Sequence, residues 1–326
     1  MKEIGGFFEL ELNSNGSLYH NNALAFNSGS SALEFFLINS KYNSVYIPYY
    51  TCDEVIKVIK KLNLSYHFYN INSNFQPQIN LDVLNDKTLL IINIYFGINN
   101  QNVNELLNLS KHIIVDASQA FFYKPLKNRF SFNSIRKFFG VPDGGFLCGT
   151  ISGEMKKNYA KLSYTKYNHQ HLVGRLEENA KVEYFNYIEN EKIISENSMG
   201  IMSKLTDALL NNVNFKKVKK QRLNNFKKLN SYFKEYNELD LRLQFEKDIP
   251  HCYPLLISNG FALKKFLIYN NIYIPTYWEN IRKYLSQKSK FELNLVDNLV
   301  CLPIDQRYTE KEMNYIIDSF KSFMNE

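Results

Sequence analysis

Short apolar runs alternate with helical patterns along the first half of the chain, from Leu24 to about Gly153. The runs predict strands, and the stretches between them begin with small or polar residues of the kind that cap helices. This alternation is typical of an α/β domain with a mainly parallel sheet. The predicted strands are 23–26, 44–47, 65–69, 89–95, 113–115 and 145–147, and the predicted helices are 31–39, 53–62 and 104–109.

The second half predicts longer helices and then a smaller α+β domain. Residues 156–197 are polar, with Glu and Lys at helical spacing, and predict extended helices that cross away from the sheet. Residues 215–233 predict a long amphipathic helix, whose lysines are better explained as a solvated outer face than as a nucleic-acid or membrane-binding surface. Strands at 252–258, 272–274 and 300–302 and helices at 261–269 and 310–323 follow. We therefore predict a large domain at 1–205 and a small C-terminal domain at 206–326.

Composition limits the classes of protein that remain. The 326 residues are 45% hydrophobic and 22% charged, near globular averages, which excludes a disordered, collagen-like or membrane-spanning chain. A net charge of +7 favours phosphates and other anions mildly but does not by itself indicate a nucleic-acid partner. Four cysteines without a CxxC pair predict neither a disulfide framework nor a metal site, and the N-terminus lacks a signal-peptide pattern. We expect a cytoplasmic protein with no metal.

Three segments of the first half carry candidate chemistry. Gly29 leads from a predicted strand into a helix that begins with Ser30 and Ser31, and such a helix start binds phosphate, although an ordinary capped turn has the same pattern. Asp116 ends a buried strand, where it can hold a protonated ring nitrogen or simply cap the next turn; Gln119 follows it.

Lys137 lies among Ile135, Phe138 and Phe139, and an amine in such an apolar setting can bond to an aldehyde, whereas a solvated lysine beside Arg136 is the alternative. A phosphate cradle, a ring-nitrogen acid and an amine are together the parts of a pyridoxal 5'-phosphate (PLP) site.

The chain resembles the DegT/DnrJ/StrS family of sugar aminotransferases, which are fold-type I PLP enzymes. Four motifs occur in the family's order and spacing within residues 5–149, and a looser resemblance runs to the end. The family's Ser-Gly-Thr-x-Ala-Leu is matched by Ser28 to Leu33, its Pro-x-x-Thr by Pro48 to Thr51, its Glu-Asp-x-x-Gln by Val115 to Gln119, and its lysine with an acid-Gly-Gly turn by Lys137 and Asp143-Gly144-Gly145.

The resemblance implies a fold-type I architecture, with a mostly parallel central sheet and a smaller C-terminal α+β domain, and it implies roles for individual residues. Lys137 would bind the cofactor covalently and transfer protons, Asp116 would pair with the ring nitrogen, and Gln119 would lie near the ring's 3-hydroxyl. Ser30 and Ser31 would hold the phosphate. A homodimer is implied as well, because active sites of this fold are completed across a two-fold interface.

The chain also departs from the family pattern. Cys52 replaces the aromatic residue that stacks on the cofactor, so Tyr50 or Tyr95 is expected to supply the ring. Phe132 replaces the serine five residues before the lysine, which leaves Ser134 and Ser131 as phosphate candidates. The family's Gly-x-Asn-x-Arg segment is not found; residues 166–171 and Arg175 occupy its region.

Two function hypotheses follow. The first is a PLP-dependent aminotransferase that transfers an amino group, with glutamate as the donor, to a keto-sugar nucleotide in polysaccharide or amino-sugar synthesis. The second is a non-catalytic binding or regulatory protein that keeps the fold. Lys137 argues against the dehydratase branch of the family, which has histidine there, and the chain lacks the GxGxxG motif of a dinucleotide-binding oxidoreductase.

Trp278 and Arg307 are the candidate substrate residues of the second half. Trp278 lies in an aromatic segment that either lines the mouth of the site or packs in the core. Arg307 follows a predicted strand, where it can bind a carboxylate or phosphate or can belong to a structural turn.

Overall fold

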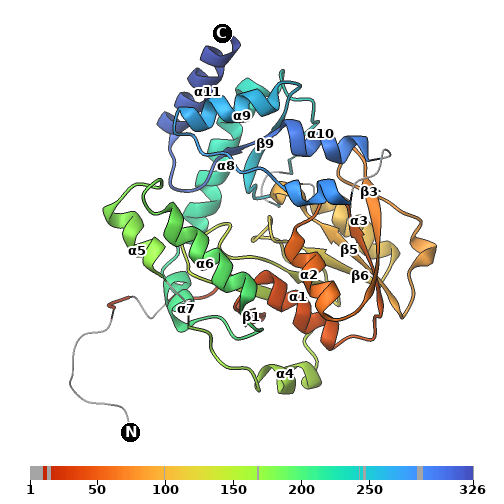
Figure 1. Ribbon diagram of the computed structural model, residues 1–326. Coiled ribbons are helices and arrows are strands. Elements are labelled where there is room, and N and C mark those ends of the chain that lie inside the picture. Colours follow the sequence, from red (N-terminus) through yellow and green to blue (C-terminus); the bar gives the residue numbers. More distant parts are fainter. Residues whose placement is uncertain are drawn as a thin grey trace.

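The computed structural model describes residues 10–12, 16–98, 100–166, 169–241, 243–244, 247–284 and 289–325. Its centre is an eight-stranded sheet in the order β1-β8-β7-β6-β5-β2-β3-β4 (Figure 1). The strands β3, β2, β5, β6 and β7 pair in parallel, while β8, β1 and β4 are antiparallel to their neighbours. The strands are β1 (Leu24–Phe26), β2 (Ser44–Pro48), β3 (Ser65–Ile71), β4 (Pro77–Gln78), β5 (Thr88–Asn93), β6 (Ile113–Asp116), β7 (Phe130–Phe132) and β8 (Gly145–Cys148).

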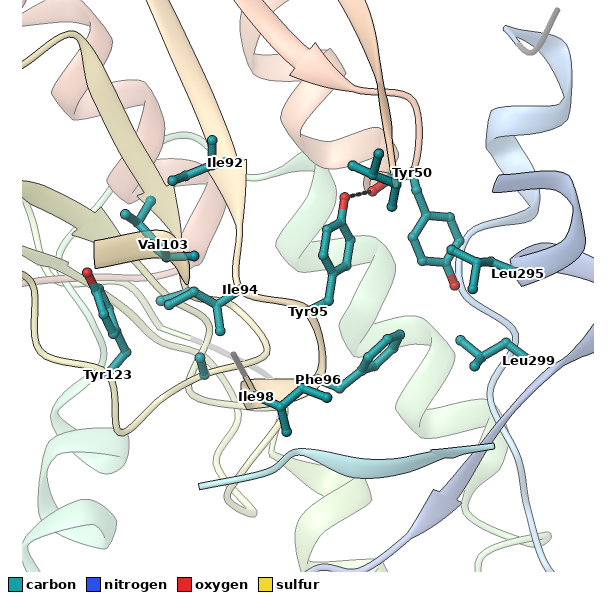
Figure 2. Packing of buried hydrophobic residues seen from close by; sticks show 14 of the residues in the cluster. Tyr50, Ile92, Ile94, Tyr95, Phe96, Ile98, Val103, Tyr123, Leu295 and Leu299 are labelled. Atoms are coloured by element: carbon teal, nitrogen blue, oxygen red, sulfur yellow. Dashed lines mark hydrogen bonds between the residues drawn. The ribbon is translucent and has the colours of Figure 1, made fainter. Parts of the chain in front are cut away.

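Alternate residues of the central strands enter two different cores, because successive side chains of a strand point to opposite faces. Leu89 and Ile91 of β5 pack with Leu33 and Ile56 on the face covered by α1 and α2. Leu90 and Ile92 belong to the core on the other face, where α3 packs (Figure 2). The helices of this half are α1 (Gly29–Ile38), α2 (Asp53–Lys61) and α3 (Asn100–Leu109). The sheet is therefore a buried layer between helices.

The C-terminal part forms its own core around a two-stranded antiparallel sheet, β9 (Cys252–Leu256) with β10 (Leu299–Pro303). Phe226, Leu229 and Phe233 pack there against β9, β10 and the neighbouring helices. They come from α8 (Phe215–Phe233), which gathers with α9 (Gly260–Tyr269) and α11 (Glu310–Met324) around β9 in Figure 1. Another helix, α10 (Lys290–Asn298), connects this part to the large sheet, since the Ile71 amide donates to Glu292 at 2.8 Å.

The remaining helices come between β8 and α8 in the sequence. They are α4 (Gly153–Tyr159), α5 (Gln170–Glu177), α6 (Tyr184–Glu196) and α7 (Lys204–Asn211). Single turns of 3-10 helix occur at Leu81–Val83, Tyr95–Gly97 and Glu279–Lys283. The predicted division into domains at residue 205 stays a prediction.

The α/β architecture and the long amphipathic helix are confirmed, and several local predictions are wrong. The predicted strand 272–274 has no strand partner; Ile272 and Ile274 are instead buried in irregular backbone of the C-terminal core. Residues 156–197 contain three separate helices rather than extended ones. The predicted strand 89–95 stops at Asn93, because the chain turns at Phe96 with a φ of 58°. The sequence did not reveal β7, α7 or α10.

Candidate active site

The carboxyl ends of the parallel strands β2, β5, β6 and β7 meet at one edge of the sheet, which is the edge where open α/β sheets bind ligands. Asn93 at the end of β5 is paired with Asp116 at the end of β6, and Asp116 is paired with Phe132 at the end of β7. The segment that carries Lys137 begins directly after β7. The topology therefore brings three of the four matched motifs to one place.

The first turn of α1 closes this edge from the side of β8. Ser28 caps the helix: its hydroxyl accepts the Ser31 amide at 3.0 Å and lies 2.9 Å from the Ser30 hydroxyl. A Cβ on Gly29 would meet the Asn133 carbonyl oxygen at 2.8 Å, and one on Gly145 would meet the Gly29 nitrogen at 2.5 Å. Only glycine allows these close approaches, so the motif glycines hold the helix start against the segment that leads to Lys137. Ser30 and Ser31 lie at a turn whose first amides have no partner within the helix.

Asp116 is almost completely buried at the end of β6. Its Oδ1 accepts the Ser118 amide at 2.8 Å. Burial raises the pKa of Asp116 above its usual value, and the Ser118 hydrogen bonds and the charge of Lys137 oppose that shift. A buried carboxylate of this kind gains stability from a cationic partner, because charge is costly to desolvate unless it is paired.

Gln119 lies one turn beyond Asp116 and is 3% exposed. Its Oε1 accepts the Phe96 amide at 3.0 Å, which fixes the orientation of the side chain. Its Nε2 is buried and has no hydrogen-bond partner. An unpaired buried donor is costly, so this amide is suited to an oxygen acceptor that a ligand supplies.

Lys137 projects from a tight turn that follows β7. The Phe138 and Phe139 amides both donate to the Ile135 carbonyl, at 2.9 and 3.1 Å, and the Ile135 amide donates to Gly144 at 3.0 Å. The Lys137 side chain is half-buried, and its Nζ lies 5.8 Å from the ring centroids of both Tyr277 and Trp278. Its charge also acts on Asp116 and on the Cys52 thiol. The aromatic rings that the structure places beside the amine are those of Tyr277 and Trp278, rather than those of its chain neighbours Phe138 and Phe139, which are buried in another cluster.

The Asp143-Gly144-Gly145 motif holds the turn that carries Lys137 in place. The Asp143 carboxylate is fully buried and accepts the Ser203 amide and hydroxyl, both at 2.7 Å, as well as the Thr206 hydroxyl at the start of α7. Burial raises the pKa of Asp143, and these hydrogen bonds oppose the shift. Gly144 has a φ of 119°, and a Cβ there would lie 2.7 Å from the Ile135 side chain. The motif therefore shapes the backbone under Lys137.

His251 joins the site from the residue before β9. Its Nε2 lies 2.9 Å from the Tyr277 hydroxyl, and its Nδ1 is buried without a partner. Burial lowers the pKa of His251 well below its usual value, and Arg222 and Lys137 act in the same direction. His251 is therefore neutral near pH 7 and offers the site a hydrogen-bonding group rather than a charge.

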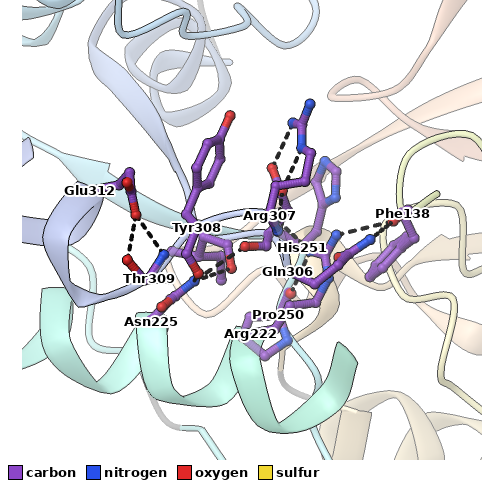
Figure 3. A network of polar contacts seen from close by, with 12 residues as sticks. Phe138, Arg222, Asn225, Pro250, His251, Gln306, Arg307, Tyr308, Thr309 and Glu312 are labelled. Carbon is purple, nitrogen blue, oxygen red and sulfur yellow. Dashed lines mark hydrogen bonds and ion pairs between the residues drawn. The ribbon is translucent and has the colours of Figure 1, made fainter. Parts of the chain in front are cut away.

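A buried arginine links the Lys137 turn to the C-terminal part of the chain (Figure 3). Arg222 of α8 is 1% exposed, and its guanidinium donates to Gln306 at 3.0 Å and to the His251 carbonyl at 3.0 Å. The Gln306 amide in turn donates to the Phe138 carbonyl at 2.7 Å. Burial lowers the pKa of Arg222 to about 10. This network fixes the residue after Lys137 to the segment before β9.

The two further serines that were predicted as phosphate ligands, Ser134 and Ser131, lie in different places. Ser134 is half-buried and directly follows Asn133, whose carbonyl oxygen lies against Gly29 at the start of α1. Ser131 lies elsewhere: its neighbours Phe130 and Phe132 pack on the α1 side of the sheet, so Ser131 points to the opposite face, where it contacts the Cys148 thiol. The structure therefore does not bring Ser131 to the first turn of α1.

Tyr50 is fully buried, and its hydroxyl donates to the Tyr277 carbonyl at 2.8 Å while its ring packs against Trp278. Arg307 forms two hydrogen bonds with Asp305 at 2.7 and 2.8 Å, as expected of a structural turn. Of the segment 166–171, residues 167 and 168 lie outside the described part of the chain.

Sequence reasoning did not find His251 or Arg222, it included Tyr277 only as a member of the aromatic segment of Trp278, and it gave Thr51 no role. The Thr51 hydroxyl and the Asn93 Oδ1 atom are also buried without a partner near the carboxyl ends of β2 and β5. Thr51 had a signal in the Pro-x-x-Thr match and Asn93 lies in a predicted strand, but His251, Tyr277 and Arg222 come from segments more than 80 residues away from Lys137 and carry no local motif.

Within the described residues, no helix combines the length and the apolar character needed to cross a bilayer. The cytoplasmic location stays a prediction.

No protein-family model matches this chain, and no curated protein matches its sequence. Solved structures do share its fold. DesV from S. venezuelae is 15% identical with a TM-score of 0.67, over 92% of this chain and 84% of that chain. A DegT/DnrJ/EryC1/StrS aminotransferase from Brucella abortus is 14% identical with a TM-score of 0.59, over 92% and 85%. NtdA from Bacillus subtilis, solved with the bound cofactor PMP, is 15% identical with a TM-score of 0.65, over 92% and 73%.

These structural similarities confirm the predicted fold. The chain has the fold-type I architecture of PLP-dependent aminotransferases, with a mostly parallel central sheet between helices.

Proposed function

We propose that this protein is a PLP-dependent aminotransferase of the DegT/DnrJ/StrS family that transfers an amino group from glutamate to a keto-sugar nucleotide. The observation that carries the proposal is the buried Gln119 Nε2 without a partner, which lies at the same sheet edge as the Asp116 carboxylate and the Lys137 amine. The fold of the aminotransferases and the four sequence motifs support the same reaction class. The sugar-nucleotide substrate and the glutamate donor rest on the family resemblance.

Each chemical group of PLP has a matching residue at this edge of the sheet. Asp116 offers a carboxylate for a cationic ring nitrogen, and the Gln119 amide offers a donor for a ring oxygen. The first turn of α1 offers a phosphate the hydroxyls of Ser30 and Ser31 and the amides that the Ser28 cap does not already hold, as it holds the Ser31 amide. Lys137 offers the amine that bonds to the aldehyde.

When bound, PLP supplies an electrophilic aldehyde and an electron sink for negative charge on the substrate carbon. The protein then has three tasks. The Lys137 amine would accept the proton that leaves the α-carbon of the amino donor and would give it up again later in the transfer, as a general base and acid. Asp116 holds the proton on the ring nitrogen. The aromatic rings of Tyr277 and Trp278 limit the access of water to the amine.

Loading the protein with PLP tests this proposal. The loaded protein is expected to show a visible absorption band that remains after dialysis, and glutamate is expected to bleach it. A panel of keto-sugar nucleotides is then added, and the one that restores the band identifies the acceptor class. A stable band that no amino donor bleaches would instead support the non-catalytic binding protein, which the replacement of the usual stacking aromatic by Cys52 favours.

The homodimer is part of the same proposal. Helices α5 and α6, which lie side by side in Figure 1, and the segment between them expose several large apolar side chains, and apolar patches of this kind mark interaction surfaces. We propose that a second copy of the chain covers them. The exposed residues are Val173 (54%), Leu176 (85%), Val182 (56%), Tyr184 (61%), Phe185 (69%), Tyr187 (43%) and Ile188 (44%).

Charged substitutions on this surface are expected to separate the subunits. The double variant Leu176→Lys with Phe185→Lys should elute and scatter light as a monomer, whereas the wild type should behave as a dimer. Leu109→Lys, at an equally exposed apolar residue on α3, is the control and should remain dimeric. A wild type that is monomeric under the same conditions would contradict the proposed surface.

A further inference from the structure

A segment of the C-terminal half places two aromatic rings in front of the Lys137 amine. Tyr277 and Trp278 are about 140 residues beyond Lys137 in the chain, yet both ring centroids lie 5.8 Å from its Nζ. Both rings are therefore close enough to contact a planar group bonded to this amine.

The same segment is fixed onto the start of α2. The Asn280 side-chain amide donates to Asp53 Oδ1 at 3.0 Å, and Lys283 forms an ion pair with Asp53 at 3.3 Å. Asp53 directly follows Cys52, whose thiol is under the electrostatic influence of Lys137 and Asp116. The structure therefore holds the segment that carries Trp278 against the start of α2, directly after Cys52, which brings a small thiol and no ring to the site.

The two rings differ in how they are held. Tyr277 is bound at both ends, since its hydroxyl contacts His251 at 2.9 Å and its carbonyl accepts the Tyr50 hydroxyl at 2.8 Å. Trp278 is half-buried, and its ring has contacts with Tyr50 at 4.8 Å and Tyr95 at 6.2 Å between centroids. Tyr277 is half-buried as well, so what distinguishes Trp278 is that ring contacts support it, whereas hydrogen bonds tether the hydroxyl and the carbonyl of Tyr277.

Tyr50 and Tyr95 form the layer behind Trp278. Both are buried, and the Tyr95 hydroxyl donates to the Tyr50 carbonyl at 2.8 Å, as Figure 2 shows. Their hydroxyls and rings are already engaged within the protein core. This arrangement argues against the expectation that either tyrosine stacks directly on the cofactor.

We propose that Trp278 supplies the aromatic face for the cofactor ring, in the place that Cys52 leaves without one. The inference rests on the proposed function. An indole attracts an electron-poor cationic ring through its π face, and it also excludes water from the amine. The single tryptophan of the chain thereby becomes a residue of the cofactor site rather than of the substrate mouth.

Because the chain contains one tryptophan, its fluorescence reports on this residue alone. PLP is titrated into the wild type, Trp278→Phe and Trp278→Leu, and visible absorption, visible circular dichroism and, in the wild type, tryptophan emission are recorded. We expect the emission to be lost in step with the appearance of the visible band. Trp278→Leu should bind PLP roughly 3- to 10-fold more weakly with altered circular dichroism, whereas Trp278→Phe should stay within about 2-fold of the wild type.

Tyr273→Leu is the matched control, because Tyr273 is a half-exposed aromatic residue of the same region and should leave PLP binding unchanged. Thermal unfolding of each variant verifies that the fold is intact, and the phenylalanine variant keeps a ring in case the leucine variant is unstable. Wild-type affinity and wild-type circular dichroism in Trp278→Leu, together with a band that still depends on Lys137, would overturn the inference and leave the proposed function standing. A wild type without any Lys137-dependent band would overturn the proposed function itself.

Discussion

Lys137→Ala is expected to abolish the visible band of the PLP-loaded protein and to reduce amino transfer on the order of 10⁴-fold or more, because one amine both binds the cofactor and moves the proton. The effect should be chemical and not structural. The turn that carries Lys137 is held by backbone hydrogen bonds of Ile135, Phe138 and Phe139, which alanine leaves in place. Thermal unfolding of the apo variant should therefore stay close to that of the wild type.

Two further variants sharpen this prediction. Lys137→Arg keeps a positive charge in front of Tyr277 and Trp278 but has no amine that can bond to an aldehyde, so it should lack the band as well. Lys157→Ala removes an exposed lysine of α4 and should leave the band unchanged. A band in Lys137→Ala equal to that of the wild type would refute the assignment of this lysine.

Asp116→Asn is expected to leave PLP binding detectable and to reduce turnover by about 100-fold or more, as the loss of a preorganised charge in a buried site does. Asparagine has the same shape, and its carbonyl oxygen can still accept the Ser118 amide that Asp116 accepts at 2.8 Å. The substitution therefore removes the carboxylate charge and keeps the turn. The readouts are the rate of bleaching by glutamate and the pH dependence of the visible band.

This variant also separates two explanations of Asp116. If the residue only caps the turn after β6, Asp116→Asn should turn over at the wild-type rate, and that result would contradict a role toward the ring nitrogen. The apo variant should be at least as stable as the wild type near neutral pH. Burial raises the pKa of Asp116, so the ionised carboxylate costs folding free energy above its unfolded pKa, and the neutral amide avoids that cost.

The sequence by itself determined the parts of the site that depend on local structure. Alternating apolar runs predicted most strands and the helices of the first half in their order, although not β4 or β7. An aspartate at the end of β6 was placed correctly because strand ends follow from the same periodicity. Gly29 and Gly145 were recognisable because backbone approaches that exclude a Cβ require glycine. The fold class followed from these local features and from motif order.

Only the tertiary structure decided what surrounds the Lys137 amine. Trp278 and His251 come to it from distant segments, and Arg222 acts on its turn through Gln306, which donates to the Phe138 carbonyl. Their positions depend on packing between distant parts of the chain. The alternation of side chains along β7 puts Ser131 on the face of the sheet opposite to Phe130 and Phe132, and thereby away from the start of α1. The unpaired amide of Gln119 likewise follows from burial, which depends on the complete fold, because a sequence shows which donors exist but not which of them lose water.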